Sequence, residues 1–205
     1  MRVAVVGGTG DFGLALARQL SESGHDVVVG SRDAERARAK AAEAGAAGAA
    51  NEDAVAGADL VVLAVVADAA LATAAALAAA IGDTPVLSVA SALRFTKEGV
   101  FPGDELRSLA ERTQDLLHAP VTAGLHSLAA ASLSRGNSDG DALVCGDDAG
   151  AKSLVLELAG AVVTGRALDA GPLASARALE GMTAVIVNLN KRYRAHAGIS
   201  VTGVP

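Results

Sequence analysis

The sequence predicts an α/β protein with a doubly wound, mainly parallel sheet, and two observations carry this prediction. Short apolar runs rich in Val recur through the first half of the chain, and the first two are bounded by glycine. Runs of helix-forming residues separate them. Strands that are apolar at consecutive positions are buried on both faces, as in a sheet whose parallel strands are joined by right-handed helical crossovers.

The individual elements follow from these patterns in chain order. In the first half, strands are expected at Arg2–Gly7, Asp26–Gly30, Leu60–Val66 and Pro85–Ala90, with helices at Phe12–Ser23, Ala34–Ala44 and Ala67–Ile81. The Ala/Gly-rich stretch Glu43–Ala50 is expected to be a loop or a frayed helix end. The second half predicts a loop at Phe95–Asp104, helices at Glu105–Leu117 and Lys152–Ala159, strands at Val121–Leu125 and Ala142–Cys145, and a last strand within Ala161–Leu168.

A long helical pattern, Leu173–Ala195, closes the chain and carries an apolar stripe. We therefore expect a dinucleotide-binding Rossmann-like domain at 1–168, followed by a small helical appendage at 169–205 that contacts the substrate site. An exposed stripe of this kind would be adhesive, so a homodimer interface is expected there. The alternative is that the helix folds back on its own sheet.

Composition excludes several classes of protein. Of the 205 residues, 51% are hydrophobic and 20% charged, and the net charge of −6 with no basic cluster argues against a nucleic-acid partner. The apolar runs are too short or too interrupted by charge for a membrane span. The single cysteine, Cys145, fits a reducing cytoplasm, and no His or Cys spacing predicts a metal site.

A glycine motif joins the first strand to the first helix. Gly8, Thr9, Gly10, Asp11, Phe12 and Gly13 fit G-x-G-x-x-G. Glycines here permit a tight turn, approach of the backbone to a pyrophosphate, and packing of the helix on the sheet. The free N–H groups of the helix start attract phosphate. The motif therefore predicts a dinucleotide, and the alternative is a purely structural turn.

The end of the second strand indicates which dinucleotide. An Asp or Glu at this place accepts from the ribose 2′-hydroxyl of NAD, but this chain has Ser31 and Arg32, with Arg36 one helical turn further on. A hydroxyl and two guanidiniums favour a 2′-phosphate, because charge-assisted hydrogen bonds to phosphate are strong. We expect NADP(H). In the alternative, Ser31 caps a helix and both arginines are solvated.

The residues that would meet the nicotinamide form no strong constellation. There is no Tyr-x-x-x-Lys pair, and His126, just past a predicted strand end, is the best polar candidate, although a lone His can equally be a hydrogen-bonded loop residue. Reduction of a ketone needs a proton donor, whereas hydride exchange between two redox cofactors needs mainly alignment and exclusion of water.

Over almost its full length, the chain resembles the NADP oxidoreductases that depend on the deazaflavin coenzyme F420. The likeness rests on the start Met1–Gly13, on Val29-Gly-Ser-Arg, on Leu143-Val-Cys-Gly-Asp-Asp, on Leu168-Asp-Ala-Gly-Pro-Leu and on the helix with Asn188. It implies that Thr9, Gly10, Asp11 and Phe12 hold phosphates and that Ser31, Arg32 and Arg36 hold the 2′-phosphate. The segment with His126, Leu128 and Ala130 would line the nicotinamide, and Ala64 and Val65 complete the expected cofactor-binding set.

The resemblance implies reversible hydride transfer between F420 and NADP(H) with the two rings stacked. The chain departs from the family pattern mostly where the two reacting rings are expected. Val66-Ala67, Val89-Ala90 and Ala129 stand at places where family members usually have a proline. Two alternatives are kept, an NADPH-dependent reductase of a small imine or ketone, in which His126 donates the proton, and a non-catalytic NADP(H) sensor.

Overall fold

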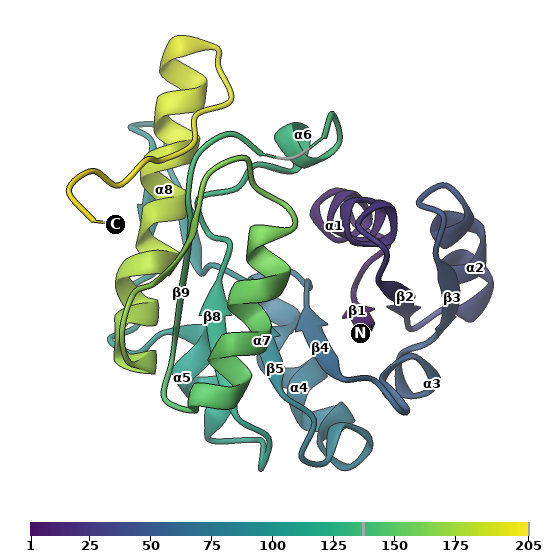
Figure 1. Cartoon of the computed structure of the whole chain (residues 1–205). Coiled ribbons are helices and arrows are strands. Elements are labelled where there is room, and N and C mark those ends of the chain that lie inside the picture. The colour runs from purple at the N-terminus through teal and green to yellow at the C-terminus, as the bar shows by residue number, and fades with distance from the viewer. Residues whose placement is uncertain (137, 205) are drawn as a thin grey trace.

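The protein is a three-layer α/β structure around one mixed sheet, and its helices and strands are labelled in Figure 1. The computed structural model describes residues 1–136 and 138–204. Eight strands follow the order β10-β9-β8-β5-β4-β1-β2-β3, and a separate hairpin pairs β6 with β7. All neighbouring strands of the large sheet are parallel except β8 and β9. The predicted doubly wound, mainly parallel fold is confirmed.

The strands are β1 (Arg2–Val6), β2 (Asp26–Ser31), β3 (Ala47–Ala50), β4 (Leu60–Leu63), β5 (Val86–Ser88), β6 (Leu93–Phe95), β7 (Val100–Pro102), β8 (Val121–Gly124), β9 (Ala142–Gly146) and β10 (Ala167–Asp169). The helices are α1 (Asp11–Glu22), α2 (Ala34–Ala42), α3 (Asn51–Val55), α4 (Ala67–Ile81), α5 (Leu109–Gln114), α6 (Ala130–Leu133), α7 (Ala149–Gly160) and α8 (Ala176–Tyr193), preceded by the short 3-10 turn η1 (Leu173–Ser175).

Burial of both faces of the sheet explains the near-continuous apolar runs. In β1, Val3 and Val5 face one core, which includes Leu16 of α1 and Leu158 of α7. Ala4 and Val6 face the opposite core, to which α3, α4, α5 and α8 contribute. Successive side chains of a strand point to opposite faces, so a strand covered on both sides needs an apolar residue at every position.

The strand order places a ligand edge at the middle of the sheet. The chain passes outward from β1 through β2 to β3, and then returns to β4 on the other side of β1. In open α/β sheets, ligands bind beyond the carboxyl ends of the strands at such a switch point. The carboxyl ends of β1, β4, β5 and β8 lie at this same edge because these strands are parallel.

The prediction of a loop or frayed helix end at Glu43–Ala50 was wrong in its second half, because Ala47–Ala50 is the edge strand β3. The strand has no β-branched residue, and Gly48 explains why it needs none. A Cβ on Gly48 would lie 2.4 Å from the carbonyl carbon of Ala37 in α2. Backbone-to-backbone packing of the helix on the strand therefore excludes the larger residues that usually signal a strand.

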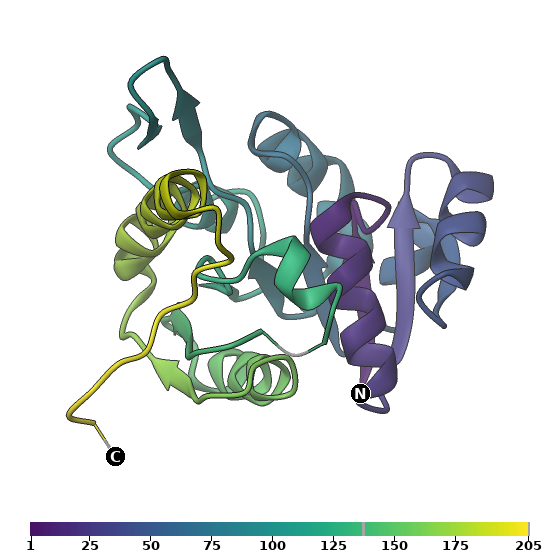
Figure 2. The ribbon, with the colours of Figure 1, turned by 90° about the horizontal axis from the view of Figure 1, so that it is seen from above.

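The predicted loop at Phe95–Asp104 was also wrong in part, since it contains most of the β6–β7 hairpin. Thr96 closes its turn: the backbone N–H donates to the carbonyl of Gly99 at 2.9 Å, and the side chain accepts from the N–H of Glu98 at 3.1 Å. Figure 2 shows the hairpin projecting from the body beside α8, which packs against β7.

The last strand is shorter and later than the predicted Ala161–Leu168, beginning only at Ala167. Before it, the chain crosses Gly140 at close range. The N–H of Gly165 donates to the carbonyl of Gly140 at 3.0 Å, and a Cβ on Gly165 would lie 2.4 Å from that oxygen. This crossing holds the segment as a turn rather than as ladder-forming strand.

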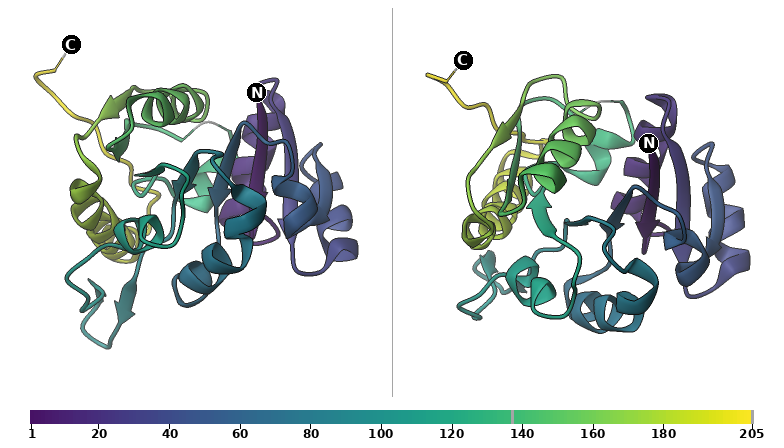
Figure 3. Two further views of the ribbon diagram at one scale, coloured as in Figure 1. Left: turned by 90° about the horizontal axis from the view of Figure 1, so that it is seen from below. Right: turned by 60° about the horizontal axis from the view of Figure 1, so that its bottom comes forward.

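After α8 the C-terminal tail returns along the body toward β10, as both views in Figure 3 show. The N–H of Asp141 donates to the carbonyl of Ile199 at 2.7 Å, which fixes the tail beside the start of β9. No helix among the described residues combines the length and the apolar character of a membrane span.

Candidate functional site

The turn between β1 and α1 depends on glycine for conformation and for space. Gly7 has φ +74°, and a Cβ there would lie 2.5 Å from Cγ1 of Val65 and 2.9 Å from the carbonyl oxygen of Ala64. Gly8 is equally enclosed, with Val5 O at 2.7 Å from such an atom, and a Cβ on Gly13 would lie 2.6 Å from Cα of Gly8. The turn therefore presses against both β4 and its own helix.

Gly10 differs from its neighbours because its surroundings are open. Among the described residues, a Cβ on Gly10 would meet only Gly7 O, at 3.7 Å, and Gly10 is exposed. As N-cap of α1 it offers no side chain, and the first N–H groups of the 12-residue helix, beginning at Asp11 and Phe12, have no intrahelical acceptor. Thr9 lies half-buried beside them. This arrangement fits a phosphate, which needs free N–H donors and close approach to the backbone.

The end of β2 holds Ser31 and Arg32 beside a cleft of about 360 Å³. This outer cleft is lined by Arg32, Asn51, Glu52, Val65, Val66, Ala69, Ala72, Thr73, Ala76 and Leu77. Arg32 and Arg36 are exposed, and within the described part of the chain neither guanidinium has an ion-pair partner. Arg36 is not among the described residues that line the outer cleft.

The cap of α2 is Asp33 rather than Ser31. Asp33 Oδ1 accepts from the N–H of Arg36 at 3.1 Å, while Oγ of Ser31 accepts from the N–H of Asp33 at 3.3 Å. The capping alternative for Ser31 is therefore wrong in its choice of residue. The Ser31 hydroxyl hydrogen remains available to an anion, because its oxygen acts as the acceptor in that contact.

A second and larger cleft, of about 470 Å³, lies at the carboxyl ends of β4 and β5. This central cleft is lined by Phe12, Val65, Val66, Ala67, Asp68, Val89, Ala90, Ser91, Leu93, Phe95 and Thr183. It shares Val65 and Val66 with the outer cleft. The two clefts thus meet at the end of β4, beside the glycine turn.

Behind the central cleft, His126 belongs to a compact hydrogen-bonded cluster. Its Nδ1 lies 3.1 Å from Oγ of Ser91, which lies 2.8 Å from Oγ1 of Thr183. Thr183 Oγ1 in turn donates to the backbone carbonyl of His126 at 3.0 Å. The ring is only 6% exposed, and burial lowers the pKa of His126 to about 4. The imidazole is therefore neutral at physiological pH, and within the described part of the chain its buried Nε2 has no hydrogen-bond partner.

The loop that presents His126 is conformationally restricted. Leu125 has φ +65°, which is uncommon for a residue other than glycine and marks a constrained backbone. The N–H of Leu128 donates to the carbonyl of Leu125 at 3.0 Å, so the four residues form a tight turn directly after β8.

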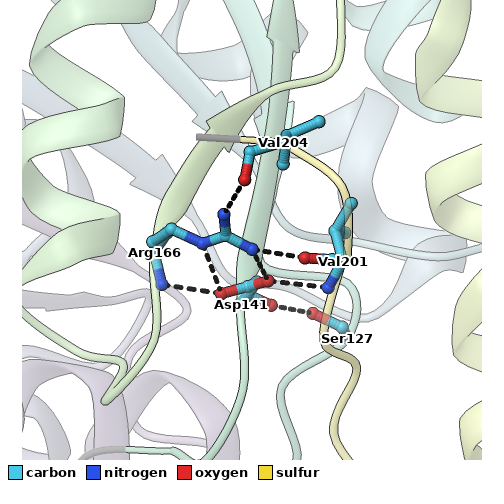
Figure 4. Close-up of polar contacts among 5 residues, drawn as sticks. All are labelled: Ser127, Asp141, Arg166, Val201 and Val204. Carbon is cyan, nitrogen blue, oxygen red and sulfur yellow. Dashed lines mark hydrogen bonds and ion pairs between the residues drawn. The ribbon is translucent and has the colours of Figure 1, made fainter.

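The C-terminal tail supports this turn through the contacts drawn in Figure 4. Oγ of Ser127 donates to the carbonyl of Asp141 at 3.3 Å. The Asp141 carboxylate accepts from Nη2 of Arg166 at 3.0 Å and from the N–H of Val201 at 2.8 Å. Arg166 also donates to the carbonyls of Val201 and Val204, and its guanidinium holds the pKa of Asp141 well below its usual range. The ion pair thus joins the tail, β9 and the His126 loop.

Only some of the residues that the sequence predicted for the site lie at this edge of the sheet. Gly8, Gly10, Gly13, Arg32, Val65 and Phe12 surround the two clefts or the turn between them, and Ala64 lies directly behind Gly7. Leu128 is buried in the core, and Ala130 begins α6, which packs against α1. Among the described residues that line the central cleft, His126, Leu128 and Ala130 are absent.

Three polar residues at this edge were not predicted from the sequence. Ser91 follows the predicted strand Pro85–Ala90, and a polar residue directly after a buried parallel strand could have indicated a site residue. Asn51, whose Oδ1 is buried without a partner within the described residues, lines the outer cleft from α3. Thr183 stands mid-helix in α8, where the sequence carries no signal for it. Within the described residues, no three His, Cys, Asp or Glu side chains gather as a metal site would require.

Comparison with known proteins agrees with this geometry. The family described as NADP oxidoreductase, coenzyme F420-dependent, matches residues 2–92. The chain is 34% identical to the F420-dependent NADP reductase of Methanothermobacter thermautotrophicus, over 100% of this chain and 96% of that protein. It is 33% identical to the protein of the same name from Methanothermobacter marburgensis, over the full length of both. A crystal structure of a candidate F420-dependent NADP-reductase from Arthrobacter sp. FB24 superposes with a TM-score of 0.86 at 27% identity, covering 99% of this chain and 100% of that one.

Proposed function

This chain belongs to the family of F420-dependent NADP reductases, and we propose that it transfers a hydride reversibly between NADP(H) and coenzyme F420 with their two rings stacked face to face. It is an NADP-dependent oxidoreductase, and NADP(H) and F420 are its substrates. The remainder of the proposal concerns which residues bind each of them.

The NADP(H) end rests on backbone N–H donors at a helix start and on two arginines that have no ion-pair partner within the described residues. The uncapped start of α1 and the open space at Gly10 suit the pyrophosphate, together with Thr9, Asp11 and Phe12. Ser31, Arg32 and Arg36 suit the 2′-phosphate, with Arg32 already at the outer cleft. Ala64 and Val65, at the junction of the two clefts, would then contact the middle of the dinucleotide.

The observation that carries the proposed reaction is the chemistry of the central cleft. Among the described residues that line it, Asp68 alone is ionisable, and it is exposed at the start of α4. The remaining walls are apolar except for Ser91 and Thr183. Apolar walls of this kind suit the faces of two planar rings and exclude water, while a carbonyl substrate would require a positioned proton donor.

When both substrates are bound, the chemistry they supply is hydride movement between C5 of the deazaflavin and C4 of the nicotinamide. The chain's own part is to align the rings and keep water away. His126 serves as a positioning residue in this proposal, because its buried neutral ring fixes the loop behind the cleft.

Isotope transfer tests the reaction directly. NADPH that carries deuterium at both C4 positions is mixed with oxidised F420 under anaerobic conditions, and the reduced deazaflavin is examined by mass spectrometry and NMR. Deuterium at C5 is the expected result for direct transfer. Solvent hydrogen at C5 would contradict ring-to-ring transfer. Oxidation of NADPH only with an imine or ketone would identify a different reductase, and binding without any turnover would identify a sensor.

We also propose that the segment 169–205 makes a homodimer through α8. Part of this helix packs on its own sheet, through Ala176 and Leu179. Val185, Leu189 and Tyr193 are exposed, and because they are four residues apart they lie on one face of the helix. Sedimentation at micromolar concentration is expected to give a dimer, and the pair of substitutions Val185→Asp and Leu189→Asp is expected to give a folded monomer. A monomeric wild-type protein would contradict the proposal.

A further inference from the structure

The cluster of Ser91, His126 and Thr183 has only one consistent arrangement of hydrogens. A backbone carbonyl can only accept, so the hydroxyl hydrogen of Thr183 is directed at the carbonyl of His126. The 2.8 Å contact between Ser91 and Thr183 must then use the hydrogen of Ser91. Both hydroxyl hydrogens are now assigned, so the 3.1 Å contact between Ser91 and His126 must use a hydrogen on Nδ1 of the ring.

This arrangement leaves the cluster with acceptors only. Each hydroxyl oxygen has two lone pairs and accepts one hydrogen bond within the cluster. Ser91 and Thr183 both line the central cleft, so what they offer a ligand there is the remaining lone pair. The ring has its hydrogen on Nδ1, so Nε2 also carries a lone pair, and this nitrogen is buried without a partner within the described residues.

We propose that Ser91 and Thr183 form a polar patch that offers only hydrogen-bond acceptors in an otherwise apolar cleft. This patch selects a ligand that presents an N–H donor, and this inference rests on the proposed function. A carboxamide N–H of the nicotinamide has this chemistry, and so has a ring N–H of the deazaflavin. A ligand that placed a carbonyl or carboxylate oxygen here would leave facing lone pairs without a hydrogen, which is costly in an apolar site. Ser91 is thus a specificity-determining residue.

The patch also has no proton to give. Donation by Ser91 or Thr183 would break a bond inside the cluster, and burial keeps the His126 ring neutral because it lowers the pKa to about 4. A patch that cannot protonate a carbonyl or imine product suits hydride exchange between two cofactors and disfavours the reduction of small imines or ketones.

Calorimetry with a matched pair of ligands tests the selection. NADP+ is compared with its 3-acetylpyridine analogue, which keeps the carbonyl but has a methyl group in place of the amide nitrogen. Wild-type protein is expected to prefer NADP+ by about tenfold, as for one lost hydrogen bond. The double variant Ser91→Ala, Thr183→Val is expected to lose this preference while it binds the analogue as tightly as wild type does. General damage to the site would instead weaken both ligands together and would overturn the proposal.

A second arm distinguishes the source of the N–H. If wild type binds NADP+ and the analogue equally, the protein is titrated with oxidised and reduced F420, since the reduced form carries an additional ring N–H. A preference for reduced F420 that the double variant lacks supports the patch with the deazaflavin as donor. No preference in either arm overturns the proposal. Ser153→Ala, an exposed serine on α7, is the control for the substitution itself.

The hydrogen assignment is tested without any substitution in the cluster. Replacing His25, His118 and His196 with Gln leaves His126 as the single histidine, and nitrogen-15 NMR of its ring then reports the tautomer. We expect a hydrogen on Nδ1 and none on Nε2, and the reverse tautomer would overturn the proposal. Calorimetry and NMR need no turnover, so a failure of hydride transfer to F420 would be recognised separately from a failure of the patch.

Discussion

The two sides of the ligand edge are built in different ways. The nucleotide side, made by the β1–α1 turn and the end of β2, takes the groups proposed to bind phosphate from residues 7–36, although its turn packs against Ala64 and Val65. The reacting side joins Ser91 after β5, His126 after β8 and Thr183 on α8. Local sequence determines the first side, and tertiary packing assembles the second.

The difference lies in what each ligand part requires. A pyrophosphate is held largely by N–H groups at a helix start, and these arise wherever a glycine turn meets a helix. The reacting ring needs a polar group at one point of an apolar wall, and any element that reaches this point can supply it. The departures from the family pattern at Val66-Ala67, Val89-Ala90 and Ala129 all lie on or next to the reacting side.

The largest effect is expected from Asp141→Asn, which tests whether the reacting side depends on the chain end. The carboxylate accepts from Arg166 and Val201 at once, and loss of its charge would remove the attraction between the carboxylate and the Arg166 guanidinium and weaken both contacts. We expect a clear fall in melting temperature at pH 7, release of the tail to proteases, and weaker F420 binding with NADPH binding little changed. If the binding of F420 and the binding of NADPH were weakened equally, the distinction between the two sides would be removed.

The pH dependence of this effect has a defined sign. Arg166 holds the folded-state pKa of Asp141 below its usual range, so the stabilisation is fully present above the ordinary aspartate pKa of about 4 and is lost as pH falls below it. The difference in melting temperature between wild type and Asp141→Asn is therefore expected to shrink below about pH 4. Asp83→Asn, at an exposed carboxylate, is the control and should show no such difference.

Gly7→Ala tests the nucleotide side and should have the next largest effect. The new Cβ would meet Val65 and the carbonyl of Ala64, and the left-handed backbone is itself unfavourable for alanine. We expect about 3 kcal/mol less stability in denaturant unfolding, with loss of NADPH binding. Gly24→Ala is a matched control, because Gly24 has φ +86° with nothing within 4 Å of its Cβ position, and it should cost about 1 kcal/mol. Equal losses would show that backbone conformation alone, rather than contact with β4, sets the requirement.

The same division explains how far the sequence predicted the structure. The four strands of the first half were predicted because each is buried on both faces, and the glycine motif was predicted because its turn is local. β3 was missed because Gly48 admits α2 at backbone distance, so that the strand lacks Val or Ile. Ser91 and Thr183 were missed because the contact between them depends on how α8 packs beside β7 and β8, which no local pattern encodes.

The smallest of the three effects is expected from Arg32→Ala, and it is the most specific. Arg32 is exposed at the outer cleft and, within the described residues, has no ion-pair partner, so its removal should leave the melting temperature within error. A charged hydrogen bond to the 2′-phosphate contributes about 1.5–3 kcal/mol, so calorimetry should show NADPH binding weakened tenfold or more and NADH binding almost unchanged. Arg38→Ala, on α2 and paired with Glu35, is the matched control and should change neither. Equal losses for NADPH and NADH would place Arg32 elsewhere on the dinucleotide. The nucleotide side would then bind NADP(H) through the helix start alone, and the contrast with the reacting side would rest on the glycine turn.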